Sequence, residues 1–144
     1  MIEYFNPNPT CKFFKSGKPK NWYINDSAVR ALAKALNVTW DKAYDILVET
    51  GKKLYNVPTS KQVMEDVLAS YGFKFVTYGK PSKDAKRPSV KQFIEDNDTS
   101  NKIYVLNLAD YFVCAIDNRI FDVSDNCLKS SVYSYWVKDL NYIN

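Results

Sequence analysis

The sequence predicts an α+β domain, with helices in the first half and an antiparallel sheet in the last third. Apolar residues recur at helical spacing between positions 25 and 72, whereas the segments after position 100 are rich in β-branched and aromatic residues. A chain of 144 residues, 46% of them apolar, fits a single domain with a substantial core. We therefore expect one domain over 1–144. It divides into an extended opening (1–24), a helical part (25–72) and a part made mainly of strands with one short helix (73–144).

The helix expected over 25–36 should lie at the centre of this domain. Its apolar side chains fall on one stripe, which must be covered: Ala28, Val29, Leu32, Ala33 and Leu36. Asp26 or Ser27 can act as the N-cap by accepting from the first backbone N–H groups. The start of this helix also combines a small polar side chain with N–H donors and the positive end of the helix dipole, which favours a nucleophile there.

Two further helices are expected in the helical part. Thr39 can cap a helix that runs to about Tyr55. A capping box, in which Gln62 follows three residues after Thr59, opens the next helix. Gly72 is a suitable C-terminal stop for it. Its inward side chains would be Val63, Val67, Leu68 and Tyr71.

Strand segments dominate the rest of the chain. The segment 73–78 alternates as a strand does, and 79–88 is a basic, turn-rich loop. Ser89 and Gln92 form a capping box for a short helix that ends at about Asp96. The last third is expected to be a strand meander over Ile103–Leu108, Tyr111–Ile116, Arg119–Val123 and Val132–Val137.

The pair Asp117-Asn118 fits a two-residue hairpin turn and therefore predicts a register. Residues equally far from the turn on the two strands should face each other, so Asp122, four residues after Asn118, opposes Val113, four residues before Asp117. Because side chains alternate between the two faces of a sheet, Tyr111, Val113 and Asp122 should share one face.

Composition excludes several kinds of chemistry. The chain contains no His, which removes Cys-His and Ser-His nucleophile pairs, histidine-based metal sites and most general-base schemes near neutral pH. The net charge of +4 gives only a mild preference for anionic partners. No metal or cofactor site is expected.

Cysteine usage and hydropathy bear on the compartment. Cys11, Cys114 and Cys127 are odd in number and widely spaced, which favours thiols in a reducing cytosol over disulfides. We expect Cys114 to be buried in a strand and Cys127 to lie in a polar loop. No apolar run approaches the ~18 residues of a membrane span, and the N-terminus does not have the pattern of a signal peptide.

Basic and aromatic residues alternate near the N-terminus, where Lys12, Lys15, Lys18 and Lys20 interleave with Phe13, Phe14, Trp22 and Tyr23. With the basic loop 79–88, this segment could form a nucleic-acid patch, because bases stack on rings and phosphates pair with ammonium groups. A solvated loop whose rings pack into the core also explains the pattern, and we favour it.

Several segments together carry a family resemblance. They are Asn6-Pro7-Asn8-Pro9, the segment 25–35, Thr39-Trp40-Asp41 with Tyr44, Pro58-Thr59-Ser60, Tyr71-Gly72-Phe73-Lys74, Tyr104-Val105-Leu106, the segment 113–118 and Phe121-Asp122. In these the chain resembles a family of small phage-encoded proteins with a papain-like cysteine-peptidase fold. The resemblance implies a papain-like arrangement of N-terminal helices packed on a C-terminal antiparallel sheet.

The resemblance also implies where a catalytic triad would be. Ser27 matches the nucleophilic Cys of that family, Tyr111 matches its His, and Asp122 matches the residue that orients the His. A serine hydroxyl needs a base, and a tyrosine has an ordinary pKa near 10 and is protonated at pH 7. A neighbouring Asp122 would not make Tyr111 a better base, because a negative charge opposes its ionisation.

The sequence therefore predicts a catalytically degenerate papain-like domain that binds a protein partner. The resemblance suggests a phage protein in the host cytoplasm or the virion, either a virion component or an effector on a host factor. One alternative is a hydrolase that uses Ser27 with Lys34 or another Lys as base, or a Cys without His. The other is a nucleic-acid-binding protein. A further reading is that Ser27 only caps a helix and Tyr111 only fills the core.

Overall fold

The computed structural model describes residues 2–5, 7, 26–83, 85–109, 111–122 and 126–140. Among these residues the chain forms α1 (Ser27–Leu36), α2 (Trp40–Leu54), α3 (Lys61–Ser70), α4 (Val90–Asp96) and a 3-10 helix η2 (Asn126–Lys129). The strands are β1 (Ile2–Tyr4), β2 (Lys74–Thr77), β3 (Lys102–Asn107), β4 (Phe112–Ile116), β5 (Arg119–Asp122) and β6 (Ser134–Asp139). The α+β class predicted from the sequence is confirmed.

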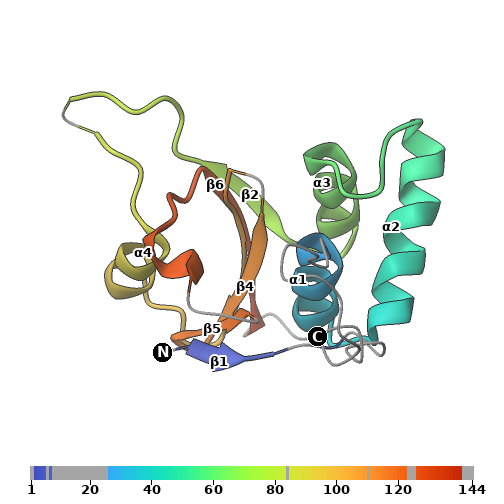
Figure 1. Ribbon diagram of the computed structural model, residues 1–144, viewed down its shortest axis with the longest axis horizontal. Helices are drawn as coiled ribbons and strands as arrows, with labels where there is room; N and C mark the ends of the chain where they lie inside the picture. The colour runs from blue at the N-terminus through green and yellow to red at the C-terminus, as the bar shows by residue number, and fades with distance from the viewer. Residues whose placement is uncertain are drawn as a thin grey trace, which may run out of the picture.

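The sheet separates two groups of helices. In Figure 1, α1, α2 and α3 lie on one side of the strands, and α4 lies on the other. Each face has its own buried apolar cluster. One includes Leu32, Leu47 and Trp136, and the other includes Phe93 and Ile120.

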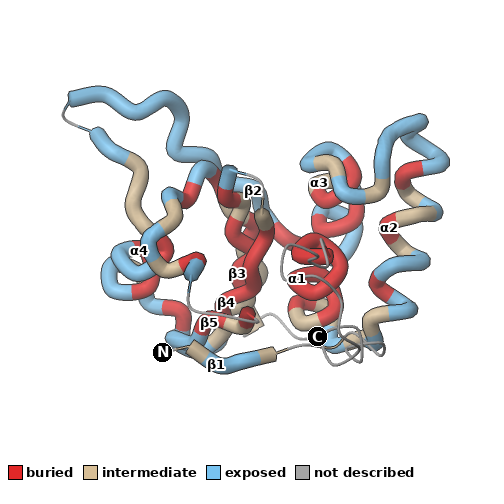
Figure 2. The backbone as a smooth tube through the Cα atoms, in the orientation of Figure 1, coloured by how far each residue is buried: buried red, intermediate tan, exposed pale blue. Residues whose placement is uncertain are grey.

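Helix α1 occupies the centre, between the sheet and α2 (Figure 1). It is buried nearly all round, as Figure 2 shows in red, and only Lys34 and Leu36 are partly exposed. Burial on every side explains its run of small residues, because alanines let the neighbouring layers approach closely. The predicted central helix is thus confirmed, with burial extending beyond the single stripe.

The helix caps agree with the sequence in two cases and differ in two. Thr39 accepts from Lys42 N (3.1 Å) and Ser89 accepts from Gln92 N (3.1 Å), as expected. Helix α3 is capped by Ser60, which accepts from Val63 N, and not by Thr59, so that expectation was wrong by one residue. At α1, Asp26 stands at the N-cap position without making a cap hydrogen bond. The expectation that Tyr71, at the end of α3, points inward was wrong, because its side chain is 42% exposed.

The sheet corrects the expectation of a purely antiparallel meander. Its order is β1-β5-β4-β3-β6-β2, so β6 pairs with β3 and not with β5, the strand before it in the chain. Strand β1 falls in the expected extended opening and pairs parallel with β5, which makes the sheet mixed. Both pairings join segments far apart in sequence, which local patterns do not specify.

The β4–β5 hairpin has the predicted register. Cys114 faces Phe121 and Ile116 faces Arg119, and the turn residues Asp117 and Asn118 have φ of 50° and 62°. Positive φ at both positions is what a tight hairpin turn of this kind requires. The register places Asp122 beside the start of β4, where the candidate site lies.

None of the helices among the described residues is both long enough and apolar enough to span a membrane. Cys114 is fully buried in β4, as expected, whereas Cys127 lies buried in η2 and not in a polar loop. Cys11, Asn6 and the lysine and aromatic residues at positions 12–23 lie outside the described residues.

Candidate functional site

Three sequence-predicted positions converge where α1 begins and where β4 and β5 meet. Ser27 is the first residue of α1, Tyr111 directly precedes β4, and Asp122 ends β5. The backbone N–H of Phe112 donates to Ser27 Oγ at 3.2 Å, and the Tyr111 hydroxyl donates to Asp122 Oδ1. The structure therefore brings all three residues into one site.

A buried arginine, which we did not anticipate from the sequence, links this site to the helix. Arg30 Nη1 donates to Asp26 Oδ1 at 2.5 Å. Arg30 Nη2 donates to the Tyr111 hydroxyl at 2.9 Å and to Asp122 Oδ1 at 3.4 Å. Arg30 is 8% exposed, and the two carboxylates are 5% and 2% exposed. One guanidinium thus contacts two buried carboxylates. Its charge offsets part of the high free-energy cost of burying them in a low-dielectric interior.

The position of Asp26 explains why it does not cap its helix. Its Oδ2 accepts from Trp40 Nε1 at 3.0 Å while its Oδ1 accepts from Arg30. The carboxylate is therefore turned toward α2 and the second turn of α1, away from the helix start. The i, i+4 spacing of Asp26 and Arg30 was the sequence signal that could have revealed this pair.

Burial and the hydrogen bond to Asp122 keep the Tyr111 hydroxyl protonated. Its pKa is raised well above its usual value, mainly by burial and further by the hydrogen bond to Asp122, although the Arg30 charge opposes the shift. The hydroxyl keeps its proton at neutral pH and is therefore unable to accept one from Ser27. This agrees with the reasoning from sequence about a Tyr–Asp pair.

A cavity of about 330 Å³ adjoins Ser27 and Tyr111. Its walls come from the start of α1, the start of α3 and the loop between β3 and β4. They combine hydroxyl, amide, ammonium and ring groups: Ser27, Ala28, Thr59, Lys61, Asn107, Ala109, Tyr111 and Phe112. Such a mixture suits a ligand with both backbone-like polar groups and apolar side chains.

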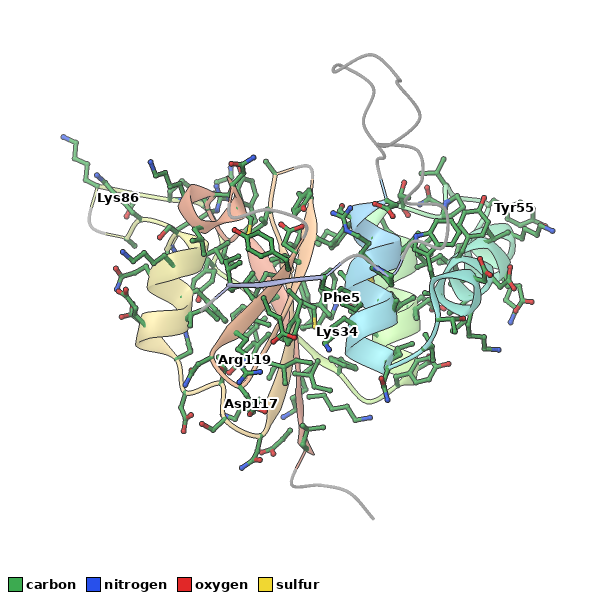
Figure 3. The ribbon with its side chains drawn as sticks, turned by 60° about the horizontal axis from the view of Figure 1, so that its bottom comes forward. Phe5, Lys34, Tyr55, Lys86, Asp117 and Arg119 are labelled. Atoms are coloured by element: carbon green, nitrogen blue, oxygen red, sulfur yellow. The ribbon has the colours of Figure 1, made fainter. Side chains whose placement is uncertain are left out.

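Lys34, the base of the alternative hydrolase, points elsewhere. It lies seven residues after Ser27, about 10 Å along the helix axis. Its ammonium lies 4.1 Å from the ring centroid of Phe121 and 5.1 Å from that of Phe5. Figure 3 labels Lys34 and Phe5, which lie together where α1 meets the sheet. These cation–π contacts account for its position.

The nucleic-acid alternative depends on two segments, 12–23 and 79–88, and the structure describes most of the second but not the first. The lysine and aromatic segment at 12–23 lies outside the described residues. In the 79–88 loop, Arg87 folds back, with its Nη2 donating to Gly79 O at 3.0 Å and its guanidinium carbon 4.1 Å from the Tyr133 ring centroid. Lys80, Lys83 and Lys86 are exposed.

Within the described ranges, no group of three or more Cys, Asp or Glu side chains is placed to hold a metal ion. Comparison with known proteins adds no relative from which to assign the site. No protein-family model, no curated protein and no solved structure matches this chain.

Proposed function

We propose that this chain is a catalytically degenerate papain-like domain that acts by binding a protein partner. The observation that carries the proposal is the state of Tyr111, at the position that the sequence resemblance gives to a catalytic His. Its hydroxyl donates to Asp122 and accepts from Arg30, so both its proton and a lone pair are engaged. In this proposal, the hydrogen bonds at the three positions that the resemblance assigns to a triad serve to hold the fold.

Among the residues that the structure describes, Ser27 makes no hydrogen bond to a group that could take its proton. Its Oγ accepts from the Phe112 backbone N–H, a group that only donates. Nucleophilic catalysis by a serine needs an adjacent base within hydrogen-bond reach. In serine enzymes, the loss of a triad member costs roughly 10⁴-fold in rate or more.

The cavity beside Ser27 supports binding as the remaining activity. Peptide segments present alternating polar backbone and apolar side-chain groups, which match the mixed lining of this cavity. The partner would be a phage or host protein, with the chain serving as a virion component or as an effector on a host factor. That part of the proposal comes from the resemblance in sequence.

A fluorophosphonate probe separates this proposal from a serine hydrolase. We expect no covalent labelling of the wild-type chain, and the same result for Ser27→Ala, as measured by intact-protein mass spectrometry. Labelling that disappears in Ser27→Ala would contradict the proposal and favour the hydrolase.

Binding is tested by selecting ligands from a random-sequence peptide library and measuring their affinities by calorimetry. Ala109→Trp fills the cavity and should weaken the selected peptides by about tenfold or more. Ala69→Trp places the same bulk on an exposed part of α3 outside the cavity lining and should leave affinity unchanged. Failure to select any peptide, or equal affinity for both variants, would contradict a binding role for the cavity.

A further inference from the structure

Strand β2 lies at one end of the sheet and exposes an unusual edge. All four of its residues are exposed, and on its outer side no strand pairs with it among the residues that the structure describes. Two of those residues are large and apolar, Phe75 at 38% and Val76 at 37% exposure. A strand edge of this kind is a template for pairing with another chain.

The hydrogen bonds to β6 indicate which backbone groups of β2 point outward. Tyr78 N donates to Tyr133 O at 3.2 Å, just beyond the end of the strand. In the same register Val76 faces Tyr135. Because bonded and non-bonded pairs alternate along an antiparallel ladder, Val76 directs its N–H and C=O toward β6. Phe75 and Thr77 therefore direct theirs outward.

A hollow of about 390 Å³ lies beside this edge. Its lining comes from the end of α2, the first two turns of α3 and β2: Leu54, Lys61, Gln62, Glu65, Asp66 and Phe75. Phe75 lies on the helix-covered face, with its ring centroid 5.3 Å from that of Trp136. A residue that paired with Phe75 on an added strand would lie on the same face, next to the hollow.

The charges around the hollow favour a peptide segment that carries a basic residue. Glu65 and Asp66 contribute two carboxylates, whereas Lys61 is the one cation in the lining and its ammonium lies over the Phe75 ring at 4.8 Å. An added strand that carried an arginine two residues from an apolar side chain would present both on the helix-covered face.

We propose that the outer edge of β2 binds an extended peptide segment of a partner protein by strand addition. The Phe75 and Thr77 backbone groups pair with the segment, the hollow takes an apolar side chain, and Asp66 faces a basic one. This surface is separate from the cavity beside Ser27 apart from Lys61, which lines both. The proposal therefore stands or falls independently of a ligand in that cavity.

The first test uses acetylated and amidated seven-residue peptides with Leu and Arg fixed two positions apart and the other positions varied. Bound peptides should slow hydrogen exchange at the Phe75 and Thr77 amides. Thr77→Pro removes one outward N–H and should weaken binding by about tenfold or more. Thr77→Ala loses the same hydroxyl but keeps the N–H, and should bind as the wild type does.

The second test changes charge without touching the strand. Asp66→Lys should shift preference from the Arg peptides toward the same peptides with Glu in place of Arg. Glu95→Lys makes the same charge change at an exposed position of α4 and should leave the preference unchanged. Equal binding by Thr77→Pro and Thr77→Ala, or no change of preference in Asp66→Lys, would overturn the proposal. So would a dimer that Thr77→Pro dissociates, because the occupant of the edge would then be a second copy of the chain.

Discussion

Arg30, in the first turns of α1, is joined to Tyr111, directly before β4, by a 2.9 Å hydrogen bond across 81 residues of sequence. The same guanidinium contacts Asp26 and Asp122. A residue of the central helix therefore holds Tyr111 and Asp122, the two residues near the β4–β5 hairpin that the sequence resemblance assigns to catalysis.

Removing the Arg30 charge should destabilise the fold strongly. Arg30→Met removes the cation that contacts the buried carboxylates of Asp26 and Asp122, and we expect a loss of about 3–5 kcal/mol in the free energy of unfolding. Urea denaturation followed by circular dichroism measures it. The matched control is Arg119→Met, which breaks the exposed ion pair with Glu3 (3.1 Å) and should cost less than about 1 kcal/mol. Equal losses in both variants would contradict the electrostatic role of Arg30.

Tyr111 should make stability fall at alkaline pH. Its pKa is raised in the folded protein, whereas the unfolded chain ionises near pH 10. The stabilisation is thus complete below about pH 10 and is lost as pH rises toward the folded pKa, because only the unfolded state releases the proton. Burial also raises the pKa of Tyr78, to about 12, so the wild type loses stability from more than one tyrosine.

The variant Tyr111→Phe isolates the contribution of this residue. Its unfolding free energy above pH 10 should fall less steeply than that of the wild type, by about 1.4 kcal/mol per pH unit for the one missing proton. Urea denaturation at a series of pH values between 8 and 11.5 gives both slopes. Identical slopes would show that Tyr111 ionises normally in the folded chain.

Introducing the Cys and His that the sequence resemblance assigns to positions 27 and 111 tests the proposed papain-like arrangement. In the double variant Ser27→Cys with Tyr111→His, a nearby imidazolium should lower the pKa of the new thiol and speed its alkylation by iodoacetamide at pH 6 by about tenfold or more over Ser27→Cys alone. Peptide mapping by mass spectrometry assigns the modified site. Equal alkylation rates would mean that residues 27 and 111 do not form such a pair.

Cys114 should be inert in the folded chain. It is fully buried in β4, and burial raises the pKa of its thiol to about 12. Since the thiolate is the reactive form, iodoacetamide at pH 8 should leave Cys114 unmodified in the native protein and modify it in guanidinium chloride. Native modification at a rate like that of the denatured chain would show that β4 opens readily.

The elements that the sequence determined are those set by neighbouring residues. Thr39 and Ser89 cap their helices through side chains three residues from the N–H groups that they accept. The turn at Asp117-Asn118 set the hairpin register, and that register placed Asp122 beside Tyr111. Each of these features depends on a few neighbouring residues, so it could be predicted from the sequence.

Tertiary structure decided what depends on distant partners. The return of β6 to β3 and the parallel pairing of β1 with β5 join segments that no local pattern links. The carboxylate of Asp26 does not cap α1, because it accepts hydrogen bonds from the charged Arg30 and the neutral Trp40 in the buried interior. A buried charge needs an opposite charge or hydrogen-bond partners close to it. The partners of Arg30 come from the start of α1, from the residue before β4 and from β5, so only the packing of these elements determines the network.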